Sequence, residues 1–201
     1  MSTPEIRKIL EDMGRAALAW SSIETLWYLA FATLLPQLPQ ETRKAIFFYL
    51  HTFASRRQLT IEVASSLLPQ KSPERTKMGQ LNARTDDLAS TRNSIIHGEF
   101  GFTYNSERDA ASILFSRGDD PKKPNKLAGK DLALELSRFC ADAAGLADEI
   151  EEFIEGPLSS RIPAAQRFLA NRSKLRVRRL LQETPESVAQ LQAILAFLRR
   201  T

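Results

Sequence analysis

Seven apolar residues between Asp131 and Ile154 alternate at four- and three-residue spacing, and this pattern constrains the fold more than any other stretch. Such spacing places the side chains on one stripe of an α-helix. An isolated helix is marginal in water, so the stripe needs other helices to cover it. The sequence therefore predicts a helical bundle. The seven residues are Leu132, Leu136, Phe139, Ala143, Leu146, Ile150 and Phe153.

Four further helices are predicted before this one, over residues 3–35, 41–53, 59–68 and 72–96. Helical apolar spacing supports each of them, and Ser72-Pro73 is a typical helix start. Leu10 in the first helix and Ile46 in the second are expected to face inward.

The spacing of apolar residues changes from helical to alternating after Gly98. Phe100, Phe102 and Tyr104 alternate with polar or small residues, as do Ile113 and Phe115, which predicts a two-stranded hairpin. The expected fold class is all-α, an antiparallel helical bundle with a small β-hairpin insertion. Gly156-Pro157 is expected to end the last helix of this body, so residues 1–156 form one domain and 157–201 a basic helical extension.

Composition narrows the class of protein. The chain of 201 residues is 43% hydrophobic and 26% charged, which is ordinary for a globular domain. No apolar run is long enough for a membrane span, the first residues do not resemble a signal peptide, and the single Cys140 cannot form an intrachain disulfide. We therefore expect a cytoplasmic protein that does not bind membranes.

The fourth predicted helix carries two different faces. Leu81, Leu88 and Ile95 form an apolar seam, whereas a neighbouring stripe is polar. The polar residues are Asn82, Asp86, Ser90, Asn93 and His97, and Arg92 lies between the two faces.

Arg92, Asn93 and His97 gather chemistry suited to a phosphodiester within the end of this helix. An imidazole with a free pKa of about 6.5 can exchange the proton of a 2′-hydroxyl near neutral pH. A guanidinium can hold the phosphate, and the amide can orient either group. Glu24, among apolar neighbours, either faces outward or supports the site as a further candidate. The chain has no Gly-rich phosphate loop and no His/Cys metal spacing, so we expect neither cofactor nor metal.

Arg92-Asn93-Ser94-Ile95-Ile96-His97 resembles the Arg-Asn-x-x-x-His signature of the HEPN superfamily, which contains helical ribonucleases and nucleotide-binding proteins of prokaryotic defence and toxin–antitoxin systems. The resemblance covers residues 4 to about 154. It implies a metal-independent endoribonuclease, a toxin or phage-defence effector, with an antitoxin or other regulatory protein as a partner. One departure is Glu99, because toxins paired with a nucleotidyltransferase antitoxin commonly have Tyr two residues after the His.

The resemblance also implies a homodimer with a composite site. Arg92 and His97 are five residues apart, about 140° around a helix, so two copies would converge on one phosphate more easily than one. The apolar seam is expected to be buried in this dimer.

Residues 157–201 carry nine Lys/Arg and two Asp/Glu, a net charge of +7. This excess indicates either an anionic partner or a solvated helix surface. With RNA as the partner, the binding candidates are Arg172, Lys174, Arg176, Arg178 and Arg179.

The sequence also allows two other interpretations. A HEPN-like module without catalytic activity would bind RNA, nucleotide or a partner protein. The chain could also be a purely structural helical dimer, with Arg92 paired to Asp86 or Glu24 and His97 only ending a helix.

Overall fold

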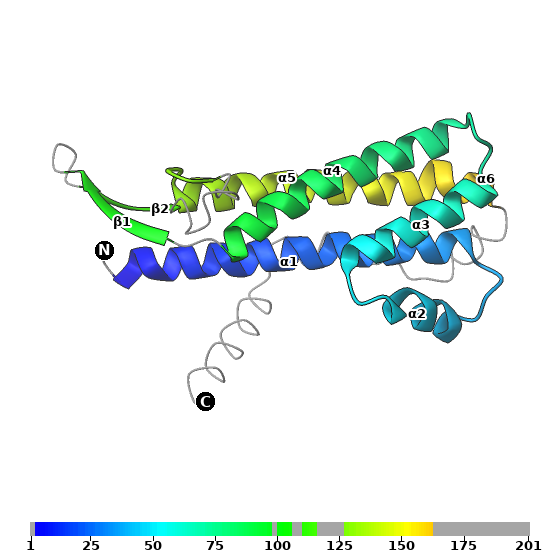
Figure 1. Cartoon of the computed structure of the whole chain (residues 1–201), viewed down its shortest axis with the longest axis horizontal. Coiled ribbons are helices and arrows are strands. Elements are labelled where there is room, and N and C mark those ends of the chain that lie inside the picture. The colour runs from blue at the N-terminus through cyan, green and yellow to red at the C-terminus, as the bar shows by residue number, and fades with distance from the viewer. Residues whose placement is uncertain (1–2, 98–99, 106–109, 116–126, 163–201) are drawn as a thin grey trace.

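Three long helices run side by side in the computed structural model, which describes residues 3–97, 100–105, 110–115 and 127–162. They are α1 (Thr3–Leu34), α4 (Pro73–Ile96) and α5 (Leu132–Phe153) (Figure 1). Two shorter helices, α2 (Gln40–Tyr49) and α3 (Phe53–Leu67), lie near the C-terminal part of α1. The expectation of a mainly helical fold is confirmed.

Helix α5 supplies one side of the core, as its apolar pattern predicted. The side chain of Asp131 accepts a hydrogen bond from the backbone N–H of Leu134 at 2.9 Å and so caps the helix start. All seven residues of the four-three pattern are buried, and they pack against α1 and α4.

Helix α1 buries a stripe that includes Ile23, Trp27 and Phe31, each at most 1% exposed. Leu10 lies one residue beyond Ile9, about 100° off this stripe. It is 47% exposed, so the expectation that it faces inward is wrong.

Helix α4 is fixed to the body along its apolar seam. Leu81, Leu88 and Ile95 are 2%, 7% and 1% exposed within a single chain. The buried Trp27 Nε1 of α1 also donates a hydrogen bond to Thr85 Oγ1 of α4 at 3.1 Å. The expectation that a dimer buries this seam is therefore wrong, because the core of one chain already covers it.

Ion pairs add a second link between α4 and α5. The carboxylate of Glu149 accepts hydrogen bonds from Arg84 and Lys77, the latter at 3.0 Å. The Arg84 contact, and then the Lys77 contact, lower the pKa of Glu149 below its ordinary value.

The helices α2 and α3 begin and end earlier than expected. Helix α2 ends at Tyr49 because the backbone of Leu50 is extended. Thr52 then caps α3, its side chain accepting from the N–H of Ser55 at 3.1 Å. Helix α2 buries Arg43 and Phe47, which leaves Ile46 beside that face and 39% exposed, contrary to expectation.

The hairpin predicted after the fourth helix is present. Strand β1 (Phe100–Asn105) pairs antiparallel with β2 (Ala110–Phe115), with Phe100 opposite Phe115. The turn after it contains Gly129, whose φ of +76° suits glycine, and its N–H donates to Phe115 O at 2.8 Å. In Figure 1 the hairpin lies at the end of the bundle where α4 finishes.

The expected helix end at Gly156-Pro157 is wrong. The backbone continues as a π-helix, η1 (Ile154–Leu158), and a last turn, α6 (Ser159–Arg161). Pro157 has no N–H to donate within this turn. The Ser159 hydroxyl donates to the carbonyls of Glu155 and Gly156 at 2.7 and 3.1 Å.

The packed body therefore reaches at least to Leu158, which is fully buried. A separate basic extension stays a prediction, because residues 163–201 lie outside the described ranges. Among the helices that are described, none has the length and apolar character needed to cross a membrane.

Candidate functional site

The Arg-Asn-x-x-x-His motif occupies the last turn and a half of α4. Ile95, inside the motif, is 1% exposed and anchors this end of the helix in the core. His97 ends the helix with φ −107° and ψ 3°, and its backbone N–H still donates to Asn93 O at 2.9 Å. The backbone that carries the three polar side chains is thus held by both packing and hydrogen bonding.

The structure brings two of the three side chains together. Arg92 is half-buried, and its Nη1 donates to Asn93 Oδ1 at 3.1 Å. Asn93 and His97 are exposed. Within the described ranges, the imidazole of His97 makes no hydrogen bond or ion pair. It is therefore accessible to a ligand from solvent.

Glu24 forms its hydrogen bond with Trp20 and not with a residue of this cluster. The carboxylate is half-buried and accepts a hydrogen bond from Trp20 Nε1 of the same helix at 2.7 Å. No hydrogen bond or ion pair joins it to Arg92, Asn93 or His97 in the described part of the chain. A supporting role for Glu24 at the site stays a prediction. Its carboxylate already accepts a hydrogen bond from Trp20, which is outside the motif.

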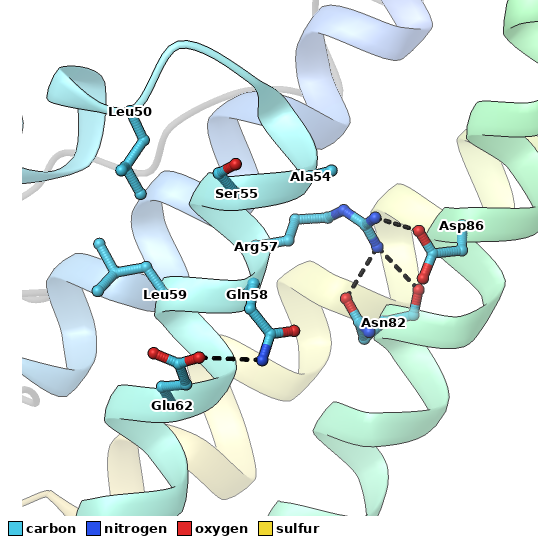
Figure 2. Close-up of a pocket in the computed structure, with 9 residues that line it drawn as sticks. All are labelled: Leu50, Ala54, Ser55, Arg57, Gln58, Leu59, Glu62, Asn82 and Asp86. Carbon is cyan, nitrogen blue, oxygen red and sulfur yellow. Dashed lines mark hydrogen bonds and ion pairs between the residues drawn. The ribbon is translucent and has the colours of Figure 1, made fainter.

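Asp86, the other carboxylate considered as a partner for Arg92, is bound to Arg57 of α3 instead. Figure 2 shows Arg57 reaching from α3 toward Asn82 and Asp86 on α4. Its Nη1 donates to the backbone and side-chain oxygens of Asn82 at 3.0 and 2.8 Å, and its Nη2 donates to Asp86. The polar stripe of α4 therefore has a structural half, held by Arg57, and an exposed half that ends on His97.

Sequence reasoning missed Arg57. Its side chain is 4% exposed, and the guanidinium lies 5.3 Å from the ring of Phe53. A signal was present in the spacing, because Phe53, Arg57, Thr60 and Ala64 fall on one face of α3. A charged residue on an inward face needs partners, and a neighbouring polar stripe supplies them.

The basic candidates Arg172, Lys174, Arg176, Arg178 and Arg179 lie outside the described residues. Within the described ranges, no three His, Cys, Asp or Glu side chains are grouped so that they could hold a metal ion. The second histidine, His51, is exposed between α2 and α3.

Comparison with known proteins found no matching protein-family model, no similar curated protein and no similar solved structure.

Proposed function

We propose that this protein is a metal-independent endoribonuclease of the HEPN type, acting as a toxin or phage-defence effector. The observation that carries the proposal is the placement of the motif. Arg92, Asn93 and His97 lie at the accessible end of a helix whose Ile95 is anchored in the core. A rigid support with accessible polar groups suits a site for an extended substrate such as RNA.

The chemistry assigns one task to each side chain. His97 removes the proton from a ribose 2′-hydroxyl, whose oxygen attacks the adjacent phosphorus. The bond from phosphorus to the 5′-oxygen breaks, and that oxygen takes up a proton from an imidazolium. Arg92 stabilises the negative charge that builds on the phosphate. The bond from Arg92 to Asn93 Oδ1 limits the motion of the guanidinium before substrate binds.

A composite site between two copies remains part of the proposal. Arg92 and His97 point about 140° apart around α4, and two copies would supply two imidazoles, one as base and one as acid. The seam of α4 cannot drive this dimer, since it is buried within one chain. Ile96, which lies within the motif and is 43% exposed, offers a small apolar contact instead.

The decisive experiment measures RNA cleavage by the purified full chain in the presence of EDTA. His97→Ala should reduce the rate by about 10²-fold or more, because the proton-transfer group is lost. His51→Ala is the matched control and should leave the rate unchanged, since His51 is exposed on the connection between α2 and α3.

The same experiment distinguishes the ribonuclease from a HEPN-like module without catalytic activity. A wild-type protein that binds RNA without cleaving it would favour a HEPN-like binding module. Equal rates for the wild type and His97→Ala would refute the assigned chemistry.

A further inference from the structure

A surface cavity of about 570 Å³ lies between the start of α3 and the middle of α4 (Figure 2). The cavity is shallow and open to solvent, so a ligand bound there would stay partly exposed. Leu50, Ala54 and Leu59 line it with apolar surface, and Asn82, Asp86 and Glu62 line it with polar groups. Leu50 and Leu59 lie together on one side of the cavity, and Asn82 and Asp86 lie on the other (Figure 2).

The polar edge is fixed before any ligand arrives. The buried Arg57 binds both Asn82 Oδ1 and Asp86, so neither side chain is free to turn. With Oδ1 accepting from Arg57, the amide nitrogen of Asn82 is left to donate. The side chain of Asp86 stays 60% exposed, so its carboxylate can still accept from a ligand. The donor and the acceptor thus come from residues one helical turn apart on α4 that both bind Arg57.

The cavity is on the same face of α4 as the motif. Asp86 and His97 are eleven residues apart, close to three full turns, which corresponds to about 16 Å along the helix. Asn82, Asp86 and His97 belong to the one polar stripe of this helix. A short piece of single-stranded RNA lying along the stripe would reach both places.

Charge decides which part of the RNA enters the cavity. Arg57 is neutralised by its ion pair with Asp86, and Glu62 adds a carboxylate that accepts only from Gln58 among the described side chains, at 3.1 Å. A phosphate would meet these carboxylates at close range and be repelled. A neutral, flat, hydrogen-bonding group is accepted instead.

We propose that this cavity binds an unpaired nucleobase of the RNA substrate, with guanine preferred; the inference rests on the proposed function. The Watson–Crick edge of guanine has an acceptor, O6, beside two N–H donors, N1 and N2. O6 accepts from the amide of Asn82, and the two donors face the carboxylate of Asp86. Adenine presents an acceptor at N1, which the carboxylate repels. The cavity therefore selects the base, whereas the motif acts on the phosphodiester.

The test is a titration of the ¹⁵N-labelled full chain with GMP, AMP, CMP, UMP and inorganic phosphate, followed by NMR. The four nucleotides share ribose and phosphate, so differences among them report on the base. GMP should bind at least about five-fold more tightly than AMP, with shifts centred on Ala54, Asn82 and Asp86. Equal binding of all four nucleotides, or shifts elsewhere, would overturn the assignment.

Two variants test the contact with the base separately from the stability of the fold. Asp86→Asn should remove the preference for GMP over AMP. Ala54→Trp places a large side chain in the cavity from an exposed position, three residues before Arg57 on α3, and should abolish GMP binding. Ala83→Trp is its control, because Ala83 is exposed on α4 and does not line the cavity. Retained GMP binding by a folded Ala54→Trp protein would refute the site.

The titration does not depend on cleavage, so the two proposals can fail separately. GMP binding without RNA cleavage would leave the base site standing and remove the ribonuclease. RNA cleavage that Ala54→Trp leaves unaltered would leave the ribonuclease standing and remove the base site. The amide of N-acetyl-arginine provides a competing probe, and tighter binding of this probe than of GMP would identify a site for a protein side chain instead.

Discussion

Replacement of Leu81 by alanine tests whether the seam of α4 belongs to the core of one chain. Leu81 is 2% exposed, and substitutions of this kind in a packed core cost about 2–5 kcal/mol. We take about 3 kcal/mol for Leu81→Ala. In a chain of 201 residues, each kcal/mol lowers the melting temperature by about 2–4 °C, so a fall of about 6–12 °C is expected.

Calorimetry on the wild type, Leu81→Ala and Leu134→Ala gives the comparison. Leu134 is 50% exposed on α5, so the same chemical change there should cost less than about 0.5 kcal/mol. The fall for Leu81→Ala should be the same at all protein concentrations, because the seam is covered within one chain. Equal falls for both variants, or a loss that grows on dilution, would show that the seam packs between chains.

Three further outcomes are expected. Mixing Arg92→Ala with His97→Ala subunits should restore part of the RNA cleavage if the site is shared between two copies; no recovery would place both residues in one chain. Deleting residues 163–201 should leave a folded body that binds RNA more weakly and with a shallower salt dependence, measured by titration at several salt concentrations; an unchanged slope would contradict a role for the basic residues. The hydrogen bond from Arg161 at 2.7 Å lowers the pKa of Glu74 below its ordinary 4.5, so this carboxylate stabilises the fold above that pH and the effect is lost as pH falls through the lowered pKa. The gap in melting temperature between the wild type and Glu74→Gln should therefore narrow in acid, and a gap independent of pH would refute the contribution of the pair.

The long helices could be predicted because their capping residues and the spacing of their apolar residues indicate the same helices. Ser72 caps α4 and Asp131 caps α5, and each cap precedes a regular apolar stripe. The start of α3 was missed, since Thr52 caps it directly after the bend at Leu50 and the next residues include two arginines. The π-helix at Pro157 was also missed, because a Gly-Pro pair usually ends a helix, and the burial of Leu158 depends on the whole fold.

The candidate site could be predicted only in part, for a similar reason. Arg92, Asn93 and His97 are close in sequence, so a helix alone places them at one end of α4. Arg57 is far from Asp86 in sequence, and only the packing of α3 on α4 brings them together. The part of the polar stripe that Arg57 binds could therefore be recognised only from the folded structure.

The chemical ends of cleaved RNA test the central claim most directly. The full chain should be incubated with RNA in EDTA, and the products analysed by mass spectrometry. Attack by a 2′-hydroxyl with His97 as proton-transfer group predicts 2′,3′-cyclic phosphate or 3′-phosphate ends beside 5′-hydroxyl ends, and almost none with His97→Ala. Fragments with 5′-phosphate and 3′-hydroxyl ends, or cleavage that requires added metal, would contradict the account.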